Sequence, residues 1–289
     1  MAITLSLGIG LGYLNNLGQE SRKEHFMIQS RIIVDDILRI LKNSPELDAL
    51  MQDTNSSEGF YAFLSQSSFI PLSYEGFEIV LQIESARAKI NPNTFLDSNA
   101  TQNSAKIDAL RTYLNRQRVD TAFGDIMLDA MGGVKEDFSY LSDLYYNRPE
   151  LVRNALEGAK HQAMLNEYFV NKYRYNLPES LNFEELFYYA KQRNTKIDLN
   201  FATLQTWMFL LDCDEYRAQT LQEAAGLCTD LECFGLTPEE QTLLARFATS
   251  FYEPIVAVTI TLRQESMLAR IDFEYDLKQK KGSRFVYQI

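Results

Sequence analysis

The side chains that could carry out chemistry in this chain are few and widely spaced. Of the two histidines, His161 follows Glu157 by one helical turn, but the second histidine of an H-E-x-x-H zinc motif does not follow. This spacing predicts a polar pair on a helix surface. His25 lies among charged residues just after an apolar run, where a position at a membrane interface explains it. The sequence contains neither a nucleophile elbow nor a phosphate-binding loop, so we predict that the protein is not an enzyme.

An acidic segment, Asp212-Cys213-Asp214-Glu215, offers the oxygen ligands that calcium prefers. It lacks the glycine and the final glutamate of an EF-hand loop, so a solvated acidic surface is the better interpretation. The cysteines lie in the same region, at Cys213, Cys228 and Cys233. In an oxidising compartment Cys228 and Cys233 would close a small loop, and three buried free thiols are an equal alternative.

The overall charge excludes one broad class of partner. The chain of 289 residues carries 28 lysines and arginines against 39 aspartates and glutamates, for a net charge of −11. Such a surface repels phosphate backbones, so we expect no nucleic-acid partner. Apolar residues make up 46% of the chain, which is enough for a large packed core.

The amino-terminal segment is the first structural signal. No charged side chain precedes Glu20, and residues 2–14 are almost wholly apolar. Nineteen residues of helix span roughly 28 Å, close to the roughly 30 Å of a bilayer core, although Asn15 and Asn16 make this span marginal. Gly8, Gly10 and Gly12 do not fit the dinucleotide-binding fingerprint, and we interpret them as small residues that allow close packing with a partner helix.

The apolar pattern continues as an amphipathic helix that Ser44-Pro45 should end. Its apolar stripe contains Val34, Leu38 and Leu41. On its other side, charge pairs are predicted between Arg31 and Asp35 and between Asp35 and Arg39.

The remaining chain alternates between strand and helix patterns. Residues 77–84 alternate apolar and polar side chains, as a half-buried strand does, and residues 254–289 read as a three-stranded meander. Residues 104–250 read as helices, with an apolar face at Ile107, Leu110 and Leu114. The simplest fold class is α+β. We expect a long helix over residues 1–45, an antiparallel sheet from residues 46–95 and 251–289 packed on that helix, and an inserted α-helical domain over residues 96–250.

A weak internal echo marks two places where an extended segment passes into a helix. Residues 89–95 read Lys-Ile-Asn-Pro-Asn-Thr-Phe, and residues 196–202 read Lys-Ile-Asp-Leu-Asn-Phe-Ala. Asn, Asp and Thr at such positions typically cap helices and form turns.

These features together resemble the K-type minor pseudopilin of the bacterial type II secretion system. In that family a membrane helix leads to a strand that ends in an R-x-N-x-N turn, followed by a large helical domain, a second N-x-N-x-A type segment and a β-meander. The corresponding segments here, 83–94, 196–203 and 254–289, occur in the same order and cover nearly the whole chain. The positions that match the family's motifs are Arg87, Asn91, Asn93, Asp198, Asn200 and Ala202.

The resemblance implies a non-enzymatic structural subunit at the tip of a pseudopilus, which supports protein export across the outer membrane. It implies a single-pass anchor in the inner membrane, a globular head in the periplasm, and the I- and J-type minor pseudopilins as partners. No cofactor is required. Family members can bind calcium, but their ligands cannot be aligned onto this chain, so a metal site is left unassigned.

Three features depart from the family pattern. A basic leader with a prepilin-peptidase glycine does not precede the apolar segment, so we expect that the sequence is truncated or begins at a misplaced start. The family's acidic Asp-Trp turn is also missing, and the most similar segment of this sequence is residues 125–133. The third departure is the unassigned calcium site.

Two alternatives remain open at this stage. A pseudopilin of a DNA-uptake system would share the fold and differ in cargo. Residues 196–203 followed by a helix also resemble the opening of a helix-hairpin-helix DNA-binding repeat, but the hairpin glycine is replaced by the acidic segment 212–215, which would repel DNA.

Overall fold

The computed structural model describes residues 2–52, 56–74, 76–97, 99, 102–133, 141, 154–175, 177, 181–226 and 228–288, and the side chains of residues 2–21, 46, 50–52 and 56 lie outside this description. The chain forms two compact units. Residues 1–85 and 254–289 make up the first, called here the sheet unit, and residues 86–253 make up the second, the helical unit. Residues 86–95, assigned above to the sheet, belong to the helical unit instead.

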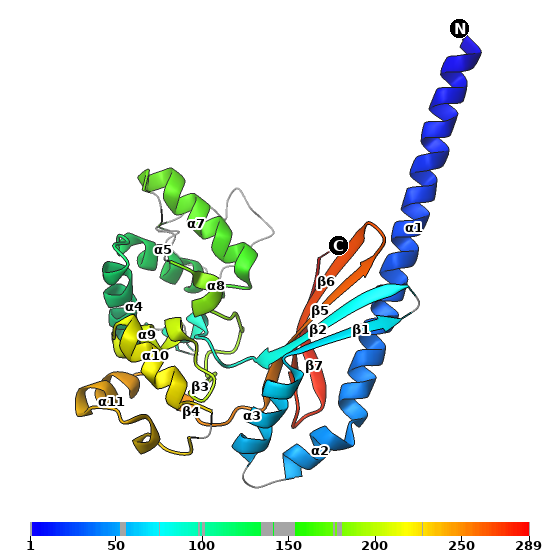
Figure 1. Cartoon of the computed structure of the whole chain (residues 1–289). Helices are drawn as coiled ribbons and strands as arrows, with labels where there is room; N and C mark the ends of the chain where they lie inside the picture. Colours follow the sequence, from blue (N-terminus) through cyan, green and yellow to red (C-terminus); the bar gives the residue numbers. More distant parts are fainter. Residues whose placement is uncertain are drawn as a thin grey trace. The chain divides into compact units, whose positions relative to one another are not determined.

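The sheet unit joins strands from both ends of the chain. Its described strands form one antiparallel sheet in the order β1-β2-β5-β6-β7 (Figure 1). Strand β2 (Phe77–Ser85) pairs directly with β5 (Ile255–Gln264), which follows the whole helical unit in sequence. The predicted union of the two strand regions in one antiparallel sheet is therefore confirmed.

Helix α1 (Ala2–Asn43) packs against β5 and β6 of this sheet and is drawn as the long blue helix in Figure 1. Val34 and Leu41 are buried and Leu38 is half-buried, as the predicted stripe requires. The ring of Phe26 stacks on Phe77 of β2 with 5.6 Å between ring centres. Apolar side chains on one face of the helix thus cover the apolar face of the sheet.

The charge pairs predicted on α1 are not the ones found. Arg39 pairs with Asp36, one turn away at a distance of 3.2 Å, and not with Asp35. Both side chains of this pair are largely exposed, so it contributes little to stability. Helix α1 ends before Ser44 and α2 (Pro45–Gln52) begins at Pro45, as the Ser-Pro signal predicts.

Strand β1 (Phe69–Tyr74) was not predicted. It contains Pro71, which argues against a strand in the sheet interior but is tolerated at an edge, where β1 lies. Helix α3 (Ser56–Ser67) precedes it and buries Phe60 and Leu64.

The carboxyl-terminal meander follows the predicted pattern with one shift. Strands β5 and β6 (Met267–Asp276) are joined at Glu265 and Ser266, where the turn was expected, and Glu265 has a positive φ of 53°. The next turn occupies residues 277–280 and not the predicted 280–283, so β7 (Lys281–Gln288) already begins within the predicted turn.

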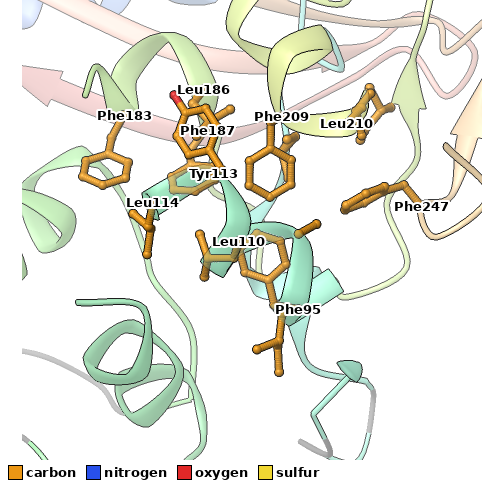
Figure 2. Packing of buried hydrophobic residues seen from close by; sticks show 14 of the residues in the cluster. Phe95, Leu110, Tyr113, Leu114, Phe183, Leu186, Phe187, Phe209, Leu210 and Phe247 are labelled. Atoms are coloured by element: carbon orange, nitrogen blue, oxygen red, sulfur yellow. The ribbon is translucent and has the colours of Figure 1, made fainter. Parts of the chain in front are cut away.

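The helical unit is built from short helices around an aromatic core. Ile107, Leu110 and Leu114 of α4 are all buried, which confirms the predicted apolar face. Phe209 of α9 lies 5.3 Å from Tyr113 and 6.0 Å from Phe95, measured between ring centres (Figure 2). The described helices are η1 (Pro92–Phe95), α4 (Ser104–Arg116), α5 (Ala122–Met131), α7 (Ala159–Tyr173), α8 (Phe183–Leu186), α9 (Leu204–Leu211), α10 (Glu215–Ala224), η2 (Glu232–Phe234) and α11 (Pro238–Leu244).

A small parallel sheet completes this unit. Strand β3 (Ile197–Asp198) pairs with β4 (Thr249–Ser250). Strand β3 coincides with the second segment of the sequence echo, so the backbone of that segment is fixed by pairing with a strand about fifty residues further along the chain.

Within the part of the chain that the structure describes, no helix combines the length and the apolar character needed to span a bilayer.

The packing of α1 on the sheet can be tested at Phe26. We expect Phe26→Ala to lower the free energy of opening of the sheet unit by about 3–5 kcal/mol, because it removes a fully buried ring from the helix–sheet interface. Ile28→Ala, at an exposed position of the same helix, should change it by less than about 0.5 kcal/mol. Native-state hydrogen exchange of the β5 amides measures both values, and equal effects would show that α1 does not hold the sheet through Phe26.

Candidate functional site

The positions that match the family's motifs all lie in the helical unit, and all are buried. Buried polar side chains must find hydrogen-bond partners within the protein, because water cannot reach them. The bonds that these side chains make therefore determine what the site does. The residues are Arg87, Asn91, Asn93, Asp198, Asn200 and Ala202.

Asn93 binds the backbone of a distant loop through both ends of its carboxamide. Its Oδ1 accepts the N–H of Leu156 at 2.8 Å, and its Nδ2 donates to the carbonyl of the same residue at 2.9 Å. The Nδ2 also donates to the carbonyl of Ala190 at 2.9 Å. The Asn93 carboxamide therefore bonds to Leu156 as the backbone of a neighbouring strand would. It provides the hydrogen-bond partners that this loop residue does not find in a helix or a sheet.

Asn91 holds a second loop in the same way. Its Oδ1 accepts the N–H of Ala190 at 3.3 Å, and its Nδ2 donates to the Ala190 carbonyl at 3.0 Å and to the Gln192 carbonyl at 2.7 Å. The Oδ1 also accepts the N–H of Asn93, which places Asn91 at the N-cap of η1. The capping role that the sequence predicts is confirmed for this residue.

Asn200 repeats this arrangement in the second segment. Its Oδ1 accepts the N–H groups of Gly226 and Cys228, each at 3.0 Å. Its Nδ2 donates to the Cys228 carbonyl at 2.8 Å and to the Phe251 carbonyl at 2.7 Å. All four hydrogen bonds that one carboxamide can form are therefore used.

The sequence echo corresponds to a shared local geometry. In both segments the first side chain accepts the backbone N–H of the residue two positions later, from Asn91 to Asn93 at 3.2 Å and from Asp198 to Asn200 at 3.1 Å. Asn93 in the first segment and Asn200 in the second then each bind both the N–H and the carbonyl of a single distant residue. We call Asn91, Asn93 and Asn200 the asparagine clamps.

The second echo segment and the residue after it also bond, through the backbone, to the residues just before the first echo segment. The Asp198 N–H donates to the Arg87 carbonyl at 2.9 Å, and the Thr203 N–H donates to the Ala88 carbonyl at 3.1 Å. The guanidinium of Arg87 lies over the ring of Tyr188, 4.8 Å from its centre. Ala202 is packed in the apolar core. Of the motif positions, Arg87 and Asp198 are therefore bonded to each other directly.

Asp198 is the one acidic residue among the motif positions. Burial raises its pKa to about 7, although the backbone N–H groups of Glu253 and Asn200, which its two oxygens accept, act to lower it. Among the described residues, no group of three or more histidine, cysteine or acidic side chains is placed to hold a metal ion.

The acidic segment 212–215 forms helix ends. Asp212, with a φ of 50°, ends α9 and pairs with Arg116 at 3.3 Å. Asp214 caps α10 by accepting the Arg217 N–H at 2.8 Å. Each aspartate thus has a local structural role at a helix end.

Two predictions about other reactive side chains are now decided. Cys228 and Cys233 form a disulfide, and Cys213 is a half-buried free thiol, which selects the first of the two cysteine alternatives. The prediction that His161 lies on a helix surface is wrong. His161 is 3% exposed, and Glu157 lies before the start of α7, where its carboxylate pairs with Lys191 at 2.8 Å.

Gly8, Gly10 and Gly12 lie in the part of α1 whose side-chain environment is outside the described residues. Their role in helix packing stays a prediction.

No protein-family model and no curated protein matches the chain. A solved structure does match: GspK in the GspK-GspI-GspJ complex from the type 2 secretion system of enterotoxigenic Escherichia coli. The match has a TM-score of 0.61 at 12% sequence identity and covers 92% of this chain and 99% of that chain.

This coverage means that the match spans both units, since 92% of the chain is more than either unit contains by itself. The fold of this chain, a sheet unit interrupted in sequence by a helical unit, is thus similar to that solved structure over nearly its full length. The particular structure it is similar to is GspK, so the resemblance to the K-type minor pseudopilin is confirmed at the level of the fold.

The clamps can be tested at Asn200. Asn200→Ala leaves buried N–H and carbonyl groups at Gly226, Cys228 and Phe251 without this partner. Because each unsatisfied buried group costs about 1–3 kcal/mol, we expect the helical unit to lose about 3 kcal/mol of stability. Urea unfolding followed by the fluorescence of Trp207, the single tryptophan and a buried residue of this unit, measures the loss.

The matched control for this experiment is Asn171→Ala, at an exposed position of α7. It should change the stability by less than about 0.5 kcal/mol. An Asn200→Ala variant as stable as this control would show that the clamp is dispensable.

The raised pKa of Asp198 predicts a pH dependence. Between about pH 4 and pH 7 the folded unit keeps the Asp198 proton that the unfolded chain has released, so the free energy of unfolding should fall as the pH rises through this window. Asp198→Asn, which does not titrate, should flatten the slope. Urea unfolding of both chains at several pH values tests this, and identical slopes would assign the dependence to another group.

Proposed function

We propose that this chain is a non-enzymatic minor pseudopilin of the K type, a structural subunit at the tip of a type II secretion pseudopilus that supports protein export across the outer membrane. The observation that carries this proposal is the match to GspK over both units and nearly the full length of each chain. A sheet unit alone is a simple scaffold, but a sheet interrupted in sequence by a large helical unit, as in this chain, is a specific architecture.

The partners follow from the same comparison. GspK was solved in a complex with GspI and GspJ. We propose that this chain likewise assembles with I- and J-type minor pseudopilins, and that the bulk of the helical unit suits a terminal position in the assembly.

The surface of α1 supports assembly through this helix. Ile28 and Ile32, one turn apart on the helix, are 58% and 54% exposed, whereas Phe26 and Val34 are buried against the sheet. The helix thus has a second apolar face besides the one that covers its own sheet. An exposed apolar pair at this spacing is typical of a helix that packs against a partner helix.

The edge of the sheet also exposes apolar groups. Leu72 and Tyr74 of β1 are exposed, although they lie directly opposite Ile79 and Phe77 of β2, which are buried. Edge strands with exposed apolar side chains are typical of surfaces that a partner covers.

The described reactive side chains do not favour catalysis. Burial raises the pKa of the Cys213 thiol to about 11, which keeps it protonated and weakly nucleophilic at neutral pH. Burial lowers the pKa of His161, and this residue lies in the packed core. Both environments are those of structural residues.

We propose that the amino-terminal segment anchors the protein in the inner membrane, with both units in the periplasm. The absence of charge before Glu20 supports the anchor. The disulfide between Cys228 and Cys233 supports an oxidising compartment such as the periplasm.

The acidic turn between α9 and α10 argues against the helix-hairpin-helix alternative. In such repeats the hairpin presents backbone N–H groups to a phosphate. Here the turn carries Asp212 and Asp214, and the N–H of Arg217 near the start of α10 is already bonded to the Asp214 side chain. A pseudopilin of a DNA-uptake system shares the fold and is separated from our proposal by its cargo.

The proposal is tested by co-purification from membranes with the I- and J-type pseudopilins of the same organism. We expect the unmodified chain to recover both partners. Ile32→Arg should reduce their recovery strongly, because it places a charge on the exposed apolar face of α1. Gly10→Leu should also reduce recovery while leaving both units folded, because it removes a small residue from the proposed helix contact.

The matched control is Tyr216→Arg, which adds the same charge at an apolar position of the helical unit that is 82% exposed. Its recovery of partners should equal that of the unmodified chain. Failure of the unmodified chain to recover either partner would contradict the proposed function. Normal recovery by Ile32→Arg and Gly10→Leu would contradict assembly through α1.

A further inference from the structure

The helical unit contains an open cavity of about 980 Å³ that the proposed function does not use. It lies between the segment around Asp97, the start of α4 and the loops around Asn154 and Arg193. Its lining is mainly polar and includes several asparagines, among them Asn99, Asn103 and Asn194. A cavity of this size can hold a small molecule, and a mainly polar lining favours one that is itself polar or charged.

Two cations of the lining bind only neutral oxygens within the described residues. Lys106 is half-buried, and its Nζ donates to the Thr94 carbonyl at 3.0 Å. The guanidinium of Arg193 donates to the carbonyls of Asp97, Met131 and Asn154 at 2.7–3.1 Å and to the Asn154 Oδ1 at 3.0 Å. In contrast, Lys191 of the same lining is paired with Glu157.

Lys106 and Arg193 therefore form no ion pair with a carboxylate among the described residues. Burial lowers the pKa of Lys106, which is the sign of an ammonium group that has lost water without gaining an anionic partner. The lining contains three cationic side chains against two acidic ones, Asp97 and Glu157, in a chain whose net charge is −11. The cavity is therefore a locally positive place on an acidic protein.

We infer that this cavity binds a small multivalent oxyanion. Its oxygens would accept the remaining N–H groups of Lys106, and its charge would offset that of Arg193. The asparagine side chains around it can donate to further oxygens or accept from hydroxyl groups. The inference stands apart from the assembly function, because it rests on the helical unit alone.

Isothermal titration calorimetry of the full chain with inorganic phosphate and with citrate tests the inference. We expect saturable binding in the millimolar range for at least one of them, and the tighter of the two identifies phosphate or carboxylate as the preferred chemistry. A two-dimensional amide NMR spectrum should show shifts at residues of the cavity, such as Asn103 and Arg193. Absence of binding by both anions, or shifts confined to other places, would overturn the inference.

Lys106→Met separates a specific site from general attraction of anions. The methionine retains the length of the side chain and removes its charge, so we expect about a tenfold or greater loss of affinity. Lys278→Met, at an exposed position of the sheet unit, is the matched control and should bind as the unmodified chain does. Equal affinity of both variants would overturn the role of Lys106. If Lys106→Met fails to fold by Trp207 fluorescence, the NMR shifts of the unmodified chain decide.

Discussion

The helical unit depends on one constraint: a buried carboxamide must satisfy its donors and its acceptor at the same time. Asn91, Asn93 and Asn200 meet this requirement by binding the N–H and the carbonyl of a single distant residue. They bind Ala190, Leu156 and Cys228. These residues lie outside the regular helices and strands, so their backbone groups have no hydrogen-bond partners in a helix or a sheet. The side chains of the asparagine clamps supply these hydrogen bonds instead. They thereby hold in place the loops that connect the short helices.

The two units divide the physical tasks of the molecule. The sheet unit carries most of the exposed large apolar side chains that the structure describes, on α1 and on the edge strands. Those are the surfaces that association can bury. The helical unit instead buries a large aromatic cluster in its own core and contains a polar cavity. This division supports the proposed assembly through the sheet unit.

The sequence predicted those features that depend on local periodicity. The alternation in residues 77–84 and 254–289 predicted strands whose apolar faces share α1, because a period of two places every second side chain on one face. Strand β1 was missed because Pro71 contradicts the pattern of an interior strand. His161 was predicted to be exposed because the charged Glu157, four residues earlier, suggested a solvent-facing helix surface. In the structure α7 begins only after Glu157, and His161 is buried.

The hydrogen-bond partners of the asparagine clamps could not be predicted from local sequence patterns. The echo between residues 89–95 and 196–202 was visible and the capping role of Asn91 could be inferred from residue type. Their partners could not, because Asn93 binds a residue 63 positions away and Asn91 one 99 positions away. Such partners are set by the packing of the whole unit. The disulfide was similarly left open by the sequence, since spacing alone allows both a bond and free thiols.

Hydrogen exchange of the backbone amides of Leu156, Ala190 and Cys228 in the unmodified chain tests the central claim most directly. Each of these N–H groups is donated to a clamp side chain. The account predicts that they exchange as slowly as the amides in the middle of α9, because both require the helical unit to open. Exchange at the rate of exposed loop amides would show that the loops open independently of the core, and it would contradict the claim that asparagine clamps hold the helical unit together.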